Sequence, residues 1–356
     1  MKRFRFKLED FARGLVWYYD YFLFRLKNPF LKKIPKNIRN ILIIDLKFIG
    51  DLIIDTPLIR ALKLHYPHSK ISILVPEGME EVLYKNPNLE KIYISQSQMK
   101  EHFDLGILLY PGDKSMCTFL RKVASFRIGI RRSGLTEPKG YYLHRKTKPI
   151  FKLKHKIEDN LDVLKTIGIE TNDKHLELYL KNTIPKYKDY IAITPVSKSH
   201  PTLPPEKFAI LGDRLIEKYK KKIIFTCTEK EKGFVEKIIS LMKNKKHTSI
   251  ATGVLQEYFS IIQNAFVVVC IDTSSQHIAA ALKVPVVSIF SAGDKKIWRP
   301  YSSNSIAIQN DKVCISCMKS YCTLKGKRYL ECVNSIQIDY ILNQVEYLVG
   351  SLTPAQ

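Results

Sequence analysis

Two series of short apolar runs, in which each run is separated from the next by a helical stretch, constrain the fold of this 356-residue chain most strongly. The first series begins at residues 41–46 and the second at residues 190–194. Strands that alternate with helices form parallel sheets with helices on both faces. The chain also exceeds the size at which one hydrophobic core usually stops growing. We therefore expect an α/β protein with two Rossmann-like, doubly wound parallel-sheet domains.

The composition divides the chain into three expected parts. Residues 1–39 form an N-terminal arm in which eleven Lys or Arg and three acidic residues stand among many aromatic residues. Residues 40–184 contain the first series and residues 185–356 the second. The expected linker is a polar, Lys-rich stretch at 181–188 that includes Pro185. Since doubly wound domains bind ligands at the carboxyl ends of their strands, we expect a cleft between the two domains.

The arm has two interpretations, which its sequence leaves equally open. Tryptophan and tyrosine among basic residues suit the headgroup layer of an anionic membrane. The aromatic residues also run nearly all round any helix, which fits a helix packed on the domain behind it. No apolar run reaches the ~20 residues that cross a bilayer, and the N-terminus lacks the features of a signal peptide. The sequence therefore predicts a cytoplasmic protein.

The formal charge of +24, from 58 Lys and Arg against 34 Asp and Glu, favours a polyanionic partner. Nucleic acid, anionic lipid and a phosphorylated glycan all fit this charge, so a non-catalytic RNA-binding protein is one alternative. Against it, the chain has no recognised RNA-binding signature, and its basic residues are not grouped with aromatic residues in one module. We expect no nucleic-acid partner.

The first candidate catalytic residue is Asp51. It lies where the apolar run 41–46 breaks into a loop and a helical stretch begins after Gly50, to end near Pro67. Glycine permits a tight backbone path there. Asp51 is then either a catalytic carboxylate at the carboxyl edge of the sheet or an N-cap of the helix, and its position alone leaves the two equal.

A second candidate site follows the apolar run 266–271. Asp272, three hydroxyl residues and His277 precede an Ala-rich helical stretch. Free backbone N–H groups and the positive end of a helix dipole can bind a diphosphate at such a place. Spacing alone slightly favours the alternative, in which these residues cap the helix and His277 lies satisfied beneath it.

The chain has no Asp-x-Asp pair, no P-loop and no G-x-G-x-x-G segment. The first absence removes the usual carboxylate–Mg²⁺ arrangement for a nucleotide diphosphate. A helix N-terminus and cationic side chains remain to stabilise a leaving diphosphate. We therefore expect catalysis that requires no cofactor.

Four of the seven cysteines lie in a polar, Lys-rich segment at 314–332. Cys314, Cys317, Cys322 and Cys332 could hold a structural Zn²⁺ ion or an iron–sulfur cluster. Their spacing matches neither a standard zinc ribbon nor a ferredoxin, so ordinary reduced thiols are the favoured interpretation.

Taken together, these segments resemble the ADP-heptose:lipopolysaccharide heptosyltransferases, which form glycosyltransferase family 9. The resemblance runs from about residue 40 to the C-terminus. It rests on the segments KFIGD at 47–51, TPLIRAL at 56–62, LPPEKF at 203–208 and DTSSQHIAAA at 272–281. It implies the two-domain GT-B arrangement and an inverting, metal-independent transferase.

The resemblance also implies roles for individual residues. Asp51 would be the general base. The implied donor-binding residues are Lys198, Glu231, Asp272, Thr273, Ser274, Ser275 and His277. The implied acceptor-binding residues are Arg60, Lys63, Arg121, Arg127, Arg131 and Arg132.

Two donor assignments depart from the family pattern or remain open. The position of the usual donor lysine reads Pro201 here, and Lys198 is the expected substitute. The ribose contact fits both Glu229 and Glu231, of which Glu231 is preferred.

The implied function is transfer of a heptose from a nucleotide sugar, ADP-heptose by resemblance, to the inner core of lipopolysaccharide. Residues 40–184 would bind the acceptor and residues 185–356 the donor. The implied location is the inner face of the inner membrane, with the anionic membrane surface as a partner. A transferase that uses another nucleotide sugar is the second alternative.

Overall fold

The structure is a computed structural model that describes residues 33–109, 114–130, 143–148, 153–181, 185–310 and 317–351, together with Leu15, Tyr19, Phe22, Leu23 and Leu26. The chain forms two compact units, Met1–Lys174 and His175–Gln356. Part of the expected linker is bonded within the second unit, because the Lys181 backbone N–H donates to Gln256 Oε1 at 3.0 Å.

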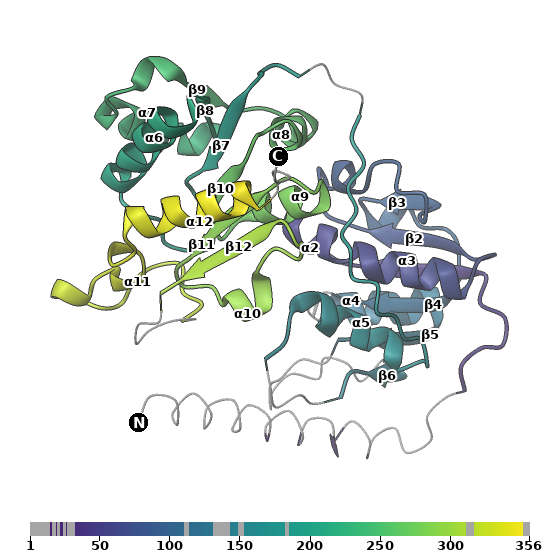
Figure 1. Ribbon diagram of the computed structural model, residues 1–356. Coiled ribbons are helices and arrows are strands. Elements are labelled where there is room, and N and C mark those ends of the chain that lie inside the picture. The colour runs from purple at the N-terminus through teal and green to yellow at the C-terminus, as the bar shows by residue number, and fades with distance from the viewer. Residues whose placement is uncertain are drawn as a thin grey trace. The chain divides into compact units, whose positions relative to one another are not determined.

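The first unit contains one parallel sheet in the order β3-β2-β1-β4-β5-β6 (Figure 1). Its strands are β1 (Asn40–Ile44), β2 (Lys70–Leu74), β3 (Lys91–Tyr93), β4 (Phe103–Leu108), β5 (Ala124–Gly129) and β6 (Arg145–Lys146). Its helices are α2 (Ile49–Ile54), α3 (Thr56–His65), α4 (Lys114–Val123) and α5 (Lys156–Lys165), with short 3-10 turns η1 (Glu80–Leu83) and η2 (Gln96–Gln98).

The second unit repeats this strand order, as β9-β8-β7-β10-β11-β12. Its strands are β7 (Tyr190–Thr194), β8 (Lys222–Thr226), β9 (Thr248–Ala251), β10 (Val268–Ile271), β11 (Val286–Phe290) and β12 (Ser305–Gln309). Its helices are α6 (Pro205–Tyr219), α7 (Lys232–Leu241), α8 (Leu255–Gln263), α9 (Ser274–Ala281), α10 (Lys295–Trp298), α11 (Glu331–Asn334) and α12 (Ile338–Gly350). Three 3-10 turns complete it, η3 (Glu229–Glu231), η4 (Lys245–His247) and η5 (Gly326–Arg328).

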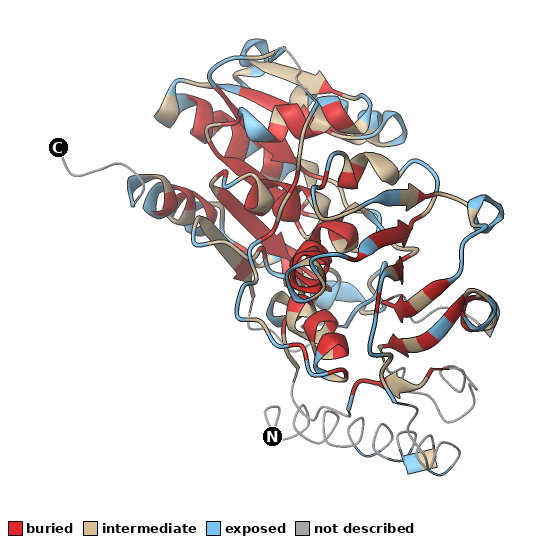
Figure 2. Ribbon diagram, turned by 90° about the vertical axis from the view of Figure 1, so that its right-hand side faces the viewer, coloured by how far each residue is buried: buried red, intermediate tan, exposed pale blue. Residues whose placement is uncertain are grey.

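The central strands explain why the sequence reads as continuous apolar runs. Residues 41–44 of β1 and all of β7 and β10 are buried, because helices cover both faces of a doubly wound sheet (Figure 2). In the second unit, α6 packs against α7 and α12, whereas α9 packs against α8, β10 and β11. The prediction of two Rossmann-like, doubly wound parallel sheets is confirmed.

The strand order places a switch point in each sheet. The direction of winding reverses between β1 and β4 in the first unit, and between β7 and β10 in the second. At such a point, the segments that follow the two neighbouring strands run in opposite directions. A crevice therefore forms at the carboxyl edge of the sheet, where ligands of these folds bind. Both candidate sites lie at these points, since Asp51 follows β1 and Asp272 follows β10.

The helical stretch expected from Gly50 to Pro67 is divided. Helix α2 ends and α3 begins at Asp55, which caps both, and Pro57 occupies the first turn of α3. Proline is favoured there because its missing N–H would have no helical partner. Gly50 lies buried inside α2 instead of in the expected turn.

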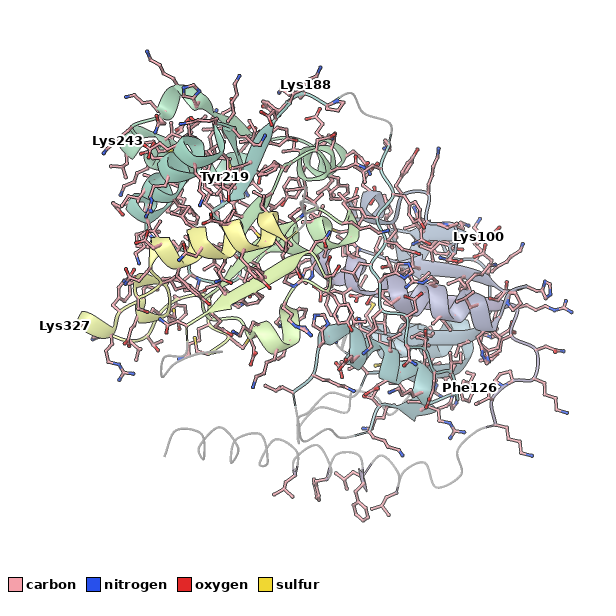
Figure 3. All side chains as sticks on the ribbon, in the orientation of Figure 1. Lys100, Phe126, Lys188, Tyr219, Lys243 and Lys327 are labelled. Carbon is pink, nitrogen blue, oxygen red and sulfur yellow. The ribbon has the colours of Figure 1, made fainter. Side chains whose placement is uncertain are left out.

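Basic side chains are spread over each unit. The labelled lysines of the first and second units, Lys100, Lys188, Lys243 and Lys327, all extend from the surface (Figure 3). Within the described part of the chain, none of the helices has the length and apolar character needed to cross a bilayer.

Candidate active site

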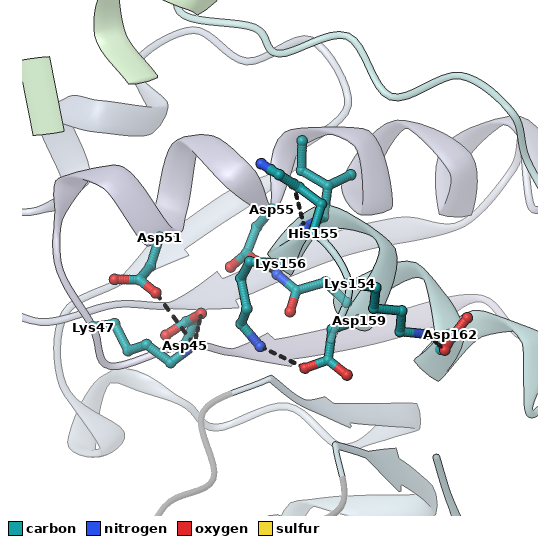
Figure 4. A network of polar contacts seen from close by, with 11 residues as sticks. Asp45, Lys47, Asp51, Asp55, Lys154, His155, Lys156, Asp159 and Asp162 are labelled. Atoms are coloured by element: carbon teal, nitrogen blue, oxygen red, sulfur yellow. Dashed lines mark hydrogen bonds and ion pairs between the residues drawn. The ribbon is translucent and has the colours of Figure 1, made fainter. Parts of the chain in front are cut away.

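Asp51 lies in a group of charged side chains at the carboxyl end of β1 (Figure 4). Lys47 stands between two carboxylates, with Nζ 3.4 Å from Asp45 Oδ2 and 3.6 Å from Asp51 Oδ1. The N-cap of α2 is Phe48, and Asp51 is the third residue of the helix. Asp51 is therefore not the N-cap, although its carboxylate accepts a hydrogen bond from the Phe48 backbone at the start of the helix.

The surroundings of Asp51 favour a base. Burial raises the pKa of its carboxyl group, and the negative charge of Asp45 adds to the rise, whereas Lys47 lowers it. Its side chain is still 14% exposed, so a substrate hydroxyl can approach it. A carboxylate with a raised pKa, held by a neighbouring lysine, accepts a proton more readily than an ordinary surface carboxylate.

The second candidate site lies at the carboxyl end of β10, where α9 begins. Thr273 is the N-cap of this helix, and no hydrogen bond from its side chain to the helix N–H groups is present. The capping interpretation holds in part, because Thr273 occupies the N-cap position and His277 is buried, but the Thr273 side chain makes no capping hydrogen bond. Asp272, Thr273 and Ser274 are all partly exposed. Backbone N–H groups of the first helical turn and the Thr273 and Ser274 hydroxyl groups thus lie where an anionic ligand can bind, and the Ser274 hydroxyl also interacts with Tyr258.

Asp272 is held in place by its neighbours. Gln276 Nε2 donates to Asp272 Oδ1 at 2.9 Å, and His200 Nε2 lies 3.5 Å from Oδ2. Burial raises the pKa of Asp272 to about 7, against the hydrogen bond from Gln276, which lowers it. A diphosphate that binds near neutral pH therefore meets a carboxyl group that carries only part of its charge.

Gly293 closes this site on one side. A Cβ atom at residue 293 would lie 1.9 Å from Asp272 Oδ2 and 3.2 Å from His200 Nε2. The first distance is far inside van der Waals contact, so a side chain at this position requires the Asp272 carboxylate to move. The segment after β11, which carries Gly293, thus lies directly against Asp272. Residues 272–277, the predicted donor-binding segment, are called the donor loop below.

His200 and Gly293 are residues that the sequence-based reasoning missed. The available signal was the position of His200 in the segment after β7, since β7 neighbours β10 and their carboxyl ends share one edge. Burial lowers the pKa of His200, against a hydrogen bond to the Lys319 backbone that raises it. Lys198, the expected substitute for the donor lysine, is exposed in the same segment.

A buried chain of hydroxyl groups lies beneath the donor loop. Ser275 Oγ donates to Thr194 Oγ1 at 2.8 Å, and Thr194 Oγ1 lies 2.6 Å from Thr226 Oγ1. Tyr258 of α8 also bonds to Ser275. Ser275 is fully buried and His277 nearly so. These two predicted donor-binding residues therefore support the loop from below, whereas Asp272, Thr273 and Ser274 reach its surface.

The two glutamates proposed for the ribose contact both have partners. Glu231 Oε2 accepts from the Thr228 backbone N–H at 2.9 Å and completes a capping box at the start of η3. The Glu229 carboxylate accepts from the Thr252 hydroxyl group. Both follow β8 at the carboxyl edge of the second sheet.

The predicted acceptor residues do not form one group in the described structure. Arg60 is 9% exposed, and its Nε lies 2.9 Å from Asp173 Oδ2. Lys63 Nζ donates to the Ser69 carbonyl at 2.8 Å, and Arg127 Nη1 donates to the Ala124 carbonyl at 2.7 Å.

Arg121, in the last turn of α4, is exposed. Burial lowers the pKa of Arg127, and the charge of Arg121 lowers it further. Arg131 and Arg132 lie outside the described residues.

The cysteine segment is described in part. Cys314 lies outside the described residues, Cys317 is exposed, and Cys332 packs in the core of the second unit. The Leu330 backbone N–H donates to Cys322 Sγ at 3.3 Å. Among described residues, no three metal-binding side chains come together. The metal site stays a prediction, and no step of the mechanism below depends on it.

Comparison with known proteins gives a consistent assignment. The model of glycosyltransferase family 9 (heptosyltransferase) matches residues 94–328. The chain is 25% identical over 306 residues to lipopolysaccharide heptosyltransferase 3 of Escherichia coli K12. This alignment covers 73% of this chain and 85% of that protein.

Two solved structures share the fold. The family 9 glycosyl transferase of Veillonella parvula DSM 2008 aligns with a TM-score of 0.75 and 18% identity, over 90% of this chain and 100% of that one. Escherichia coli heptosyltransferase WaaC with ADP aligns with a TM-score of 0.69 and 15% identity, over 87% and 99% of the two chains. Because the family model covers more than half of the chain, and because its expected motifs stand at the switch points of both sheets, this protein belongs to glycosyltransferase family 9, the heptosyltransferases.

Proposed function

We propose that this protein transfers a heptose from ADP-heptose to the inner core of lipopolysaccharide, with inversion at the anomeric carbon and without a metal cofactor. The observation that carries the proposal is the pair of sites at the switch points. A lysine-tethered carboxylate with a raised pKa follows β1, and a helix N-terminus with accessible hydroxyl groups follows β10. One supplies a base, and the other a place for a diphosphate.

The proposed reaction is a direct displacement. An acceptor hydroxyl oxygen forms a bond to the anomeric carbon while its proton passes to Asp51. The bond from the anomeric carbon to the diphosphate oxygen breaks, and ADP leaves with that electron pair. The N–H groups at the start of α9, with the Thr273 and Ser274 hydroxyl groups, stabilise the charge that develops on the leaving group.

Support for ADP as the donor nucleotide comes from relatives. Heptosyltransferase WaaC, which shares the fold, was solved with ADP. Support for the acceptor comes from the printed name of the Escherichia coli relative, a lipopolysaccharide heptosyltransferase.

A donor comparison tests the function. With lipopolysaccharide inner core as acceptor, ADP-heptose is expected to be turned over at least ~10²-fold faster than UDP- or GDP-sugars. The reason is that a nucleotide without the matching hydrogen-bonding groups leaves polar groups of the site buried and unpaired, which costs free energy. Product formation is measured by mass spectrometry. Faster transfer from another nucleotide sugar would identify that sugar as the donor in place of ADP-heptose. Absence of transfer together with tight RNA binding would favour the RNA-binding alternative.

We further propose that the arm docks the protein on the cytoplasmic face of an anionic membrane. Four described apolar side chains of the arm, Leu15, Tyr19, Phe22 and Leu26, are 50–59% exposed. Their spacing of four, three and four residues gathers them on one helical face. An exposed apolar face in a strongly basic segment is typical of helices that lie in the headgroup layer.

The membrane proposal predicts a selective loss of vesicle binding. The variant L15S/Y19S/F22S/L26S is expected to sediment with phosphatidylglycerol vesicles at least ~10-fold less than wild type, because its apolar contact with the lipid is removed. The matched control is Y340S/Y347S, which removes two side chains of α12 that are 51% and 71% exposed. Equal losses in both variants, or no loss in the first, would contradict docking through the arm.

A further inference from the structure

Close to Asp51, the structure buries two further carboxyl groups that have no part in the proposed reaction. Asp45 directly follows β1, and Asp55 joins α2 to α3. Both residues are 0% exposed. Three carboxyl groups thus share one neighbourhood, in which Lys47 is the cation of the described residues that pairs with Asp45 and Asp51 (Figure 4).

The four oxygens of Asp45 and Asp55 divide into two that have donors and two that lack them. Lys47 Nζ lies 3.4 Å from Asp45 Oδ2, and Asn160 Nδ2 donates to Asp55 Oδ1 at 2.6 Å. Asp45 Oδ1 and Asp55 Oδ2 are buried without a hydrogen-bond donor in the described part of the chain. Burial raises the pKa of Asp55, and Asp45 raises it further through its charge and a side-chain hydrogen bond, so the two carboxyl groups are neighbours.

One proton satisfies both remaining oxygens. A carboxylic acid is a donor and a carboxylate is an acceptor, so a proton on one group supplies the bond that both lack. Two adjacent buried carboxylates would instead repel each other, and one of them takes up a proton. Asp55 is the better holder, because its other oxygen accepts only from the neutral amide of Asn160.

The charges around the pair lead to the same result. With all three carboxylates ionised, Lys47 would face three negative charges in a buried region, and uncompensated buried charge is costly. A proton on Asp55 leaves two carboxylates, Asp45 and Asp51, one on each side of Lys47.

We propose that Asp45 and Asp55 share one proton, which Asp55 holds and donates to Asp45, and that this pair positions Lys47 beside Asp51. Asp45 and Asp55 are positioning residues in this account, and the part that concerns Asp51 rests on the proposed function. Because Lys47 is shared with Asp45, it stabilises the negative charge of Asp51 less than it would if it paired with Asp51 alone. Asp51 therefore keeps a raised pKa and remains a better base. Burial and the charge of Asp45 raise the pKa of Asp55 well above its ordinary value, as the proposal requires.

The polar and charged groups that face the pair come from two helices, α2 and α5, and from the segment before α2. Lys47 precedes α2, Asp51 belongs to it, and Asn160 and Lys156 belong to α5. Lys156 Nζ is 3.0 Å from Asp159 Oδ2 and acts on Asp51 through its charge. His155, the buried N-cap of α5, accepts the Ile157 backbone N–H at Nδ1.

Infrared difference spectroscopy tests the shared proton without any dependence on turnover. Asp55→Asn keeps the shape and the donor of a protonated acid, so it is expected to fold. The difference between wild type and D55N at neutral pH is expected to show the loss of one carboxylic-acid C=O band. Asp159→Asn, a control that removes a partly exposed carboxylate of α5, is expected to lose carboxylate bands instead. Loss of carboxylate bands in D55N would overturn the proposal.

A thermal series gives a second test. A group whose folded pKa is raised stabilises the fold fully below its unfolded pKa of about 3.9, and this stability is lost as pH rises through the folded pKa. As pH rises above about 4, the unfolding equilibrium constant of wild type relative to D55N is therefore expected to rise by up to tenfold per pH unit, until the folded pKa is reached. The Tm of wild type falls relative to that of D55N over this range. A constant difference in Tm between the two proteins would contradict a raised pKa of Asp55.

A pH–rate comparison tests the link to Asp51. Asp45→Asn is expected to move the acid limb of the kcat profile down by about one pH unit, because Lys47 then acts on Asp51 alone. D55N is expected to keep the limb in place, since it removes no charge. An unmoved limb in D45N would overturn the positioning role. If Asp51→Asn kept its turnover while D55N lost the acid band, the base assignment would fall and the proton pair would stand.

Discussion

Asp51→Asn is expected to lower kcat by at least ~10²-fold while the affinity for the donor stays close to that of wild type. Asparagine keeps the shape of the side chain but cannot take the proton of the acceptor hydroxyl. General bases typically contribute ~10² to ~10⁴ in rate, and the proposed donor site lies in the other unit. Initial rates of heptose transfer and calorimetry with ADP measure the two quantities.

The control for this variant is Asp339→Asn, which changes an exposed carboxylate of α12 that pairs with Arg214. It is expected to keep the rate of wild type. Lys47 Nζ lies 3.6 Å from Asp51 Oδ1, so loss of the Asp51 charge also removes one of its two carboxylate neighbours. Circular dichroism shows whether the fold is retained. Unchanged turnover in a folded D51N protein would mean that another group accepts the proton.

Gly293→Ala is expected to weaken donor binding by about 10- to 100-fold, which corresponds to an overpacking cost of about 1–3 kcal/mol. The added Cβ would lie 1.9 Å from Asp272 Oδ2 and would force this carboxylate away from Gln276 and His200. A displaced Asp272 moves into the space in front of the α9 N-terminus. Calorimetry with ADP measures the loss.

Gly233→Ala provides the matched comparison, since a Cβ at this position of α7 would have no atom within 4 Å. This variant is expected to bind ADP as wild type does and to be slightly more stable, because alanine favours helix over glycine. If G293A folds and binds ADP with unchanged affinity, the close approach of residue 293 has no part in the donor site.

The sequence predicted the fold well because its information is local. Continuous apolar runs such as β1 and β10 identify strands covered on both faces, and their alternation with helices identifies parallel sheets. The positions of Asp51 and Asp272 at carboxyl strand ends follow from the same pattern. Element boundaries were less secure, since the expected single helical stretch is divided at Asp55, whose side chain contacts Asn160, far along the chain.

The parts of the sites that the sequence did not predict are contacts between distant segments. The charge on Arg60 suggested an acceptor contact, but only the folded chain shows that it pairs with Asp173. His200 and Gly293 reach Asp272 from the segments after β7 and β11, and no local pattern marks them. The hydroxyl group of Ser275 likewise looked accessible beside Ser274, although helical geometry turns it into the interior.

The hydroxyl chain that runs from Thr226 through Thr194 to Ser275 joins two strands to the first turn of α9. It holds the first turn of α9 against the sheet, so the proposed binding of a nucleotide there would cost little conformational entropy. A change of nucleotide or sugar preference in this scaffold would then come through the side chains that reach the loop surface. The backbone path would be inherited unchanged from one specificity to the next.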